Sequence, residues 1–176
     1  MAAIESLQDP AVAGLLMAAY SKQPTPVQER LLGIMGRTQD PRYLPLFEGA
    51  NHIAASVRID ALQQYHLPQS IPLLEVLAKD PDPASAASAT DAIRTMANAF
   101  RDQGDRPGTG RAYLALYRIA ADGESRAEAL EGIKAYPVAE AYDELRTALG
   151  EDGLLNLPPQ VLTGMARVLG EAGRND

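Results

Sequence analysis

The two histidines are the residues of this chain that are best suited to acid–base chemistry or to metal binding. They stand at positions 52 and 66. We expect them near opposite ends of one helix, about 21 Å apart along its axis at a rise of about 1.5 Å per residue. At that separation His52 and His66 cannot share a metal ion without other ligands. The chain contains no cysteine, which excludes disulfides, thiolate metal sites and a cysteine nucleophile.

Other stretches that suggest a catalytic or binding motif lack residues that the chemistry needs. DPDP at 80–83 offers two carboxylates, but no glutamate follows at the spacing of a calcium-binding loop. The glycine-rich stretch RDQGDRPGTGR at 101–111 lacks the GxxxxGK[ST] pattern of a phosphate loop, and we interpret it as an enlarged loop between repeats. HExxH and GxSxG are also absent. The sequence therefore predicts a protein that is not an enzyme and has no cofactor or metal site.

Composition indicates a folded, helical protein. Apolar residues make up 46% of the 176 residues and charged residues 22%, while aromatic residues are only 5%. Valine, isoleucine and threonine are sparse outside helical patterns, which favours an all-α fold. Proline and glycine punctuate short apolar-periodic runs. We predict helices at 10–21, 25–36, 41–49, 51–66, 69–79, 83–101, 109–122, 125–136, 138–150 and 158–172.

Several of these helices have start signals. Asp9, Asp40 and Asp82 each precede a proline, which suits the first turn of a helix. Asn51 and Ser125 are predicted to be N-caps for the same reason.

A motif of about 31 residues repeats along the chain. VRIDAL at 57–62 matches SRAEAL at 125–130 and SATDAI at 88–93, and VQERLL at 27–32 and LPPQVL at 157–162 keep the apolar ends. The last residues of these motifs are 30, 31, 37 and 32 positions apart. Each unit would be a helix pair that buries its apolar face only by stacking on its neighbours.

Two arginines fall on the apolar faces of the second helices. At about 100° per residue, Arg58 lies within the apolar arc of its helix, and Arg126 takes the equivalent place in the fourth unit. A buried charge is costly unless it is paired and hydrogen-bonded. We therefore expect both arginines to be structural, with the stem along the core and the guanidinium at the inter-helix turn. There we expect it to meet turn carbonyls or an acid, such as Asp122 or an aspartate of a neighbouring unit.

This pattern resembles the HEAT-like repeats, including the variety first noted in phycobilisome-lyase-type proteins. The match is strongest in 41–101 and 112–150, with Ser125, Ala89 and Asn51 departing from it. The resemblance implies one domain over residues 1–176, a right-handed α–α superhelix of about five helix pairs. It also keeps open a chromophore lyase or isomerase that handles a bilin, and a DNA glycosylase of HEAT-like fold.

The charge distribution limits the partners. The net charge is −7, and the segment from Asp122 to Asp152 holds nine acidic and three basic residues. A nucleic-acid-binding protein normally has a basic face, so we expect no nucleic-acid binding. This disfavours the glycosylase, and a basic protein partner is more plausible. No signal peptide and no run of about 18 apolar residues is visible, so we expect a cytoplasmic protein that does not bind a membrane, a monomer or a weak homo-oligomer.

The polar faces of the second helices are the best candidates for partner binding. If these helices line a concave surface, their outward residues form two parallel rows that could hold a segment of a protein partner. The first row is Asp60, Asp91 and Glu128, and the second is Gln63, Arg94 and Glu131. The function we favour at this stage is non-catalytic: an adaptor, an inhibitor or an assembly scaffold.

Overall fold

The computed structural model describes residues 9–150, 163–164 and 166–168, and every regular element in this part of the chain is a helix. The predicted all-α fold is therefore confirmed for the described residues. The elements are α2 (Pro10–Tyr20), α3 (Thr25–Gly36), η1 (Pro41–Tyr43), α4 (Leu44–Gly49), α5 (Ala55–Tyr65), η2 (Pro68–Ser70), α6 (Ile71–Leu77), α7 (Pro83–Gln103), α8 (Arg106–Ile119), α9 (Gly123–Ala135) and α10 (Ala139–Gly150). Residues 163, 164 and 166–168 are also helical, but most of the helix predicted at 158–172 lies outside the described residues.

Three of the predicted start signals cap helices. Asp9 accepts a hydrogen bond from the backbone N–H two residues later at 2.8 Å, and Asp40 accepts one from the Arg42 N–H at 3.0 Å. Asp82 accepts one from the N–H three residues later, also at 3.0 Å. These bonds satisfy amide donors that the first turn of a helix leaves unpaired.

Two other predicted caps were wrong. α5 begins at Ala55 without a side-chain cap, so Asn51 lies in the turn before it. In α9 the cap is Asp122, which accepts from the Ser125 N–H at 2.8 Å, and the helix starts two residues earlier than predicted. An Asx cap needs the chain to be extended at the capping residue, and the sequence did not show where the preceding turn ended.

The glycine-rich stretch at 101–111 is not the enlarged loop that we expected. α7 continues to Gln103 and α8 begins at Arg106, so only two residues connect them. Gly104 has a φ of 76°, a left-handed conformation that glycine adopts without strain. Asp105 then caps α8 by accepting from the Gly108 N–H at 2.9 Å. The extra residues of this repeat lengthen its helices instead.

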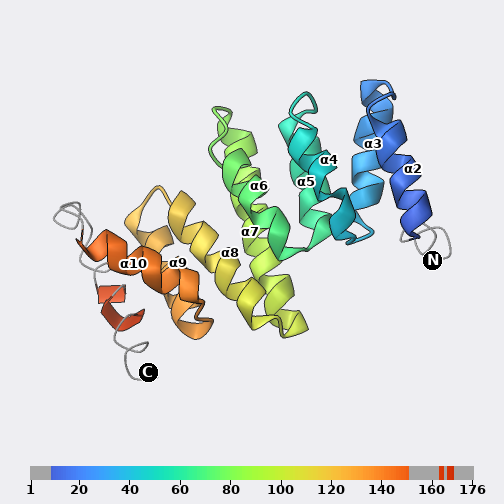
Figure 1. Cartoon of the computed structure of the whole chain (residues 1–176). Helices are drawn as coiled ribbons and strands as arrows, with labels where there is room; N and C mark the ends of the chain where they lie inside the picture. Colours follow the sequence, from blue (N-terminus) through green and yellow to red (C-terminus); the bar gives the residue numbers. More distant parts are fainter. Residues whose placement is uncertain (1–8, 151–162, 165, 169–176) are drawn as a thin grey trace. The chain divides into compact units, whose positions relative to one another are not determined.

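The chain divides into two compact units, residues 1–95 and 96–176, with the division inside α7. Unit 1 holds α2 to α6 and the first part of α7, which Figure 1 shows in blue to green. α3 packs against α5, and α5 against α6. In its core the rings of Phe47 and Tyr65 lie 5.0 Å apart between centroids. The other large, fully buried side chains are Leu32, Met35, Tyr43, Ile59, Leu62, Leu74 and Ile93.

Unit 2 has its own apolar core around the pair α8 and α9, which pack closely on each other. Its buried cluster consists of Leu114, Leu130, Ile133, Val138, Ala141, Leu145 and Val168. Glycine makes the close packing possible. A Cβ on Gly110 would lie 2.2 Å from the Tyr136 carbonyl oxygen, and one on Gly132 would lie 2.2 Å from the Tyr113 ring.

No helix among the described residues is long and apolar enough to cross a membrane.

Candidate functional site

Two of the predicted partner-binding residues line a hollow on the surface of unit 1. The hollow has a volume of about 250 Å³. Asp60 and Gln63 of α5 lie on one side, and Thr95 of α7 lies on the other. Gln64 and His66 complete the lining. We call this feature the α5–α7 hollow.

The α5–α7 hollow follows from the amphipathic pattern of α5. The buried side chains of α5 are Arg58, Ile59, Ala61, Leu62 and Tyr65. Packing that face against the core turns Asp60 and Gln64 outward, where both are exposed, with Gln63 half-buried beside them. His66 ends the helix in a left-handed conformation, with a φ of 46°. One helix and its C-cap thus supply four of the five residues of the lining.

The carboxylates near the hollow differ in their partners. Among the described residues, none forms a hydrogen bond or an ion pair with the Asp60 carboxylate. Asp91, on α7, accepts a hydrogen bond from Arg94 at 2.7 Å. Asp91 therefore has a cationic partner on its own helix, whereas Asp60 has none among the described residues. Asp60 is the charge of this region that is available to a ligand.

The remaining two predicted binding residues belong to the other unit. Glu128 and Glu131 are exposed on α9. Glu131 lies 3.6 Å from Arg167 and 4.0 Å from Lys134 between charged atoms. The structure therefore brings Asp60 and Gln63 together, and Asp91 with Arg94. The two continuous rows across all the repeats stay a prediction.

The two arginines on apolar faces have different environments. Arg58 is buried, and its Nε has no hydrogen-bond partner among the described residues. Burial lowers the pKa of Arg58, while Tyr20 and Asp80 act in the opposite direction. Arg126 is half-buried, and its Nε donates to the Ala120 carbonyl oxygen at 3.2 Å. Of the two, Arg126 bonds a carbonyl of an inter-helix turn, as expected. Arg58 makes no such bond among the described residues, but it interacts electrostatically with Asp80, an acid of the neighbouring repeat.

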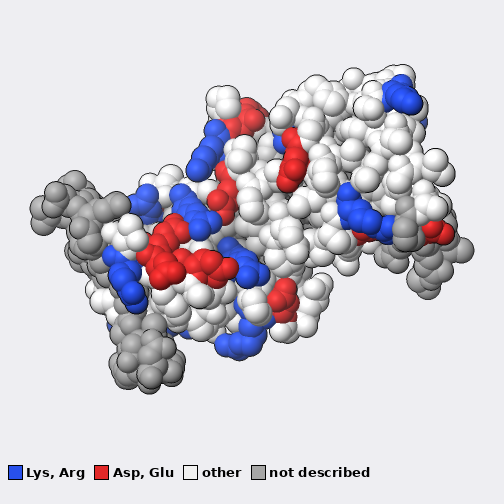
Figure 2. Space-filling model, in the orientation of Figure 1, with Lys and Arg blue, Asp and Glu red and all other residues white. Residues whose placement is uncertain are grey.

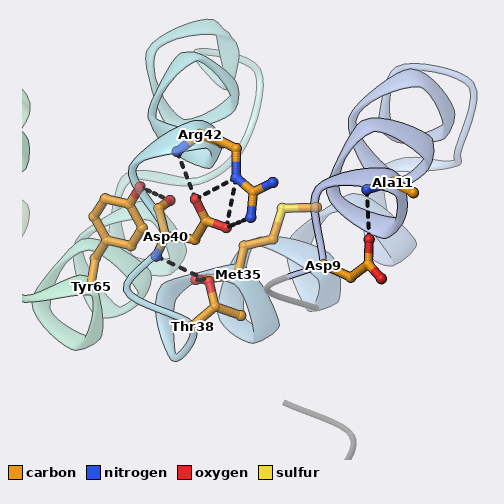
Figure 3. Close-up of polar contacts among 7 residues, drawn as sticks. All are labelled: Asp9, Ala11, Met35, Thr38, Asp40, Arg42 and Tyr65. Atoms are coloured by element: carbon orange, nitrogen blue, oxygen red, sulfur yellow. Dashed lines mark hydrogen bonds and ion pairs between the residues drawn. The ribbon is translucent and has the colours of Figure 1, made fainter. Parts of the chain in front are cut away.

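A dense polar cluster that the sequence only partly revealed surrounds Asp40, where the first helix pair of unit 1 meets the second (Figure 3). Its carboxylate accepts hydrogen bonds from the Arg42 side chain as well as from the Arg42 backbone N–H. Its carbonyl oxygen accepts one from the buried Tyr65 hydroxyl. Thr38 accepts from the Asp40 N–H at 3.4 Å and donates to the Met35 carbonyl oxygen at 2.7 Å. Because each of these bonds holds a turn or a helix start, the cluster is structural.

Asp40 should make the stability of the chain depend on pH. The hydrogen bond from the Arg42 side chain is the main cause that holds the pKa of Asp40 below its ordinary value. A carboxyl whose pKa is lower in the folded state stabilises the fold above its unfolded pKa, about 3.9. This stability is lost as the pH falls through the folded pKa.

Asp40→Asn is expected to lower the free energy of unfolding at pH 7 by about 1–2 kcal/mol. The variant should also lose less stability than the native chain below pH about 4, because the titrating group is gone. Urea unfolding at pH 7 and pH 3, followed by circular dichroism, measures both effects. Asp102→Asn, which changes an exposed carboxylate on α7, is the control and should change stability by less than about 0.5 kcal/mol. If Asp40→Asn and Asp102→Asn lost the same stability between pH 7 and pH 3, Asp40 would not be a source of the acid sensitivity.

Ion pairs occupy much of the acidic surface of unit 2. Arg111 pairs with Glu140 at 3.1 Å, and Arg118 pairs with Glu144 at 2.6 Å. Both pairs join α8 to α10, where Figure 2 shows acidic and basic side chains intermixed. The negative charge of this segment is therefore partly neutralised within the unit, and it attracts a basic partner less than its composition suggested.

The two histidines and the acidic residues do not gather at one place in the part of the chain that the structure describes. They contain no group of three or more histidine, aspartate or glutamate residues placed to hold a metal ion. His52 and His66 lie outside the ends of α5 and not within one helix as predicted. His52 bonds through Nε2 to the Gln28 side-chain oxygen. Since the Gln28 amide nitrogen donates to the Tyr20 carbonyl oxygen, the His52 Nε2 must be the donor in its bond.

Three comparisons with known proteins give no relative of this chain: no family model, no curated protein and no solved structure matches it.

Proposed function

We propose that this chain is a non-catalytic, HEAT-like α-solenoid that binds a segment of a partner protein in the α5–α7 hollow. The observation that carries the proposal is the meeting of Asp60 and Gln63 with Thr95 of the next second helix around one hollow. An outward polar face on one helix is ordinary solvent-exposed surface. A hollow shared by two helices of successive repeats is a place where a protein segment can be held.

Recurrent features of the helix pairs support the solenoid part of the proposal. α4 and α6 each follow a short 3-10 helix that starts with a proline. Arg58 and Arg126 are each the fourth residue of a second helix, α5 and α9 respectively. Such repetition is expected where each pair stacks on the next. A right-handed superhelix remains the arrangement that we propose.

The size of the hollow favours a protein segment over a pigment. Pockets for small molecules usually measure about 300–1,000 Å³, and the α5–α7 hollow measures about 250 Å³. A bilin is an open-chain tetrapyrrole and needs a larger enclosure, whereas one side chain of a bound segment fits this space. The bilin lyase or isomerase therefore stays the less supported alternative, and adaptor, inhibitor or scaffold are the roles that we propose.

Blocking the hollow tests the proposal. A library of random peptides is selected on the immobilised native chain, and binding of the recovered peptides is then measured by fluorescence anisotropy. Thr95→Arg places a long side chain at the hollow and should weaken the peptides at least tenfold, a loss of about 1.4 kcal/mol. Val76→Arg adds the same side chain at an exposed position on α6, outside the lining, and should have no effect.

Two outcomes would contradict this function. Peptides that bind both variants equally would place the binding surface elsewhere, and a failure to recover any peptide would argue against segment binding. Co-expression with a bilin, followed by visible absorbance of the purified chain, tests the alternative directly.

A further inference from the structure

We propose that the α5–α7 hollow selects a lysine or arginine side chain of the bound segment, with the Asp60 carboxylate as its counter-charge. This inference rests on the proposed function and specifies the residue that the hollow recognises. It also moves the expected contact with a basic partner from the acidic segment of unit 2 to one carboxylate of unit 1.

Asp60 is the acidic residue that lines the hollow, and it differs from several other aspartates of unit 1 in its partners. Asp40 is occupied by Arg42, and Asp91 by Arg94. Asp82 accepts hydrogen bonds from the backbone and side chain of Ser85 at the start of α7. Asp60, in contrast, is exposed, lines the hollow and has no such bond from a described residue. A cation entering the hollow would therefore meet an available negative charge.

The other lining groups suit a donor-rich cation. Gln63 and Gln64 carry amide oxygens, and Thr95 carries a hydroxyl oxygen, so each offers an acceptor at the wall of the hollow. A lysine ammonium has three donors and no acceptor, and an arginine guanidinium has five donors and no acceptor. An acidic side chain would instead face Asp60 with a like charge. Charge and hydrogen-bonding capacity thus favour the same class of side chain.

His66, which is part of the lining, has a strained backbone. His66 has a φ of 46°, in the left-handed region where glycine is the usual residue at the end of a helix. A side chain there costs free energy, on the order of 1 kcal/mol, and the residue that bears this cost lines the hollow.

The test uses peptides selected on the native chain and on Asp60→Lys. We expect peptides that bind the native chain to share a lysine or arginine at one fixed position. On Asp60→Lys that position should change to aspartate or glutamate. Glu48→Lys makes the same charge change at an exposed position of α4 that is not part of the lining, and it should select the same peptides as the native chain.

A double-mutant cycle gives the decisive measurement. Replacing the fixed lysine by norleucine, which keeps the methylene chain, should weaken binding to the native chain about tenfold or more. The same replacement should have little effect on binding to Asp60→Asn.

The outcomes separate this inference from the proposed function. If peptides are blocked by Thr95→Arg but share no basic position, or if the cycle shows no coupling with Asp60, the inference fails and the hollow remains a binding site. If Thr95→Arg does not weaken the peptides, the proposed function fails as well.

Discussion

Replacing Gly36 by alanine is expected to lower the free energy of unfolding by about 2–4 kcal/mol. Gly36 ends α3 and is buried against α5. A Cβ there would lie 2.4 Å from the Ala61 carbonyl oxygen, 3.1 Å from its carbon and 3.2 Å from the Ala61 Cα, whereas ordinary contact begins at 3.4 Å. All three atoms belong to the backbone, so no side-chain rotation relieves the clash, and α3 and α5 would have to separate.

Gly33 provides a matched control on the same helix. A Cβ on Gly33 meets no atom within 4 Å, so Gly33→Ala should raise stability by about 0.5–1 kcal/mol through helix propensity alone. Urea unfolding of both variants, followed by far-ultraviolet circular dichroism, measures the two effects. If both variants changed stability in the same direction and by a similar amount, α3 and α5 would not be closely packed at Gly36.

Local signals in the sequence predicted the helix pairs well. The Asp-Pro starts at Asp9, Asp40 and Asp82 are short-range chemistry, because each cap acts on an amide within three residues. Apart from the caps at Asn51 and Ser125, the prediction that failed is one in which a distant contact matters. At 101–111 the glycines indicated a loop, but Gly110 lies inside α8, where it allows the Tyr136 carbonyl to approach. A glycine needed for packing and a glycine needed for a turn look alike in a sequence.

The candidate site shows the same division. Helical phase alone placed Asp60 and Gln63 outward and Arg58 inward, as the structure shows. It did not reveal Thr95 or His66, because their place in the α5–α7 hollow depends on how α7 lies against α5. The proline at position 68 indicated that the helix ends before it. It did not indicate that the backbone of His66 would be left-handed, because glycine is the usual residue in that conformation.

Arg58→Met is expected to leave the chain as stable as the native protein or more stable, by up to about 1 kcal/mol. Methionine keeps an unbranched stem of similar length in the core. It also removes a buried charge whose Nε lacks a hydrogen bond among the described residues, and replacing a poorly paired buried ion by an apolar residue is often neutral or stabilising. The lowered pKa of Arg58, caused mainly by burial, shows that the folded environment disfavours the charge. Arg58→Ala loses the stem as well and should be about 2–4 kcal/mol less stable than Arg58→Met.

Arg126 is the control for Arg58, because it occupies the equivalent position of its repeat but bonds the Ala120 carbonyl oxygen at 3.2 Å. Arg126→Met removes that bond and should cost about 1 kcal/mol. Thermal and urea unfolding of Arg58→Met, Arg58→Ala and Arg126→Met measure these effects, and we expect a loss of stability from Arg126→Met but none from Arg58→Met. A loss of stability in Arg58→Met as large as that in Arg126→Met would show that the Arg58 guanidinium itself stabilises the fold. No loss in Arg58→Met beside a loss in Arg126→Met would show that the stem of Arg58, and not its charge, stabilises the packing of the first two helix pairs.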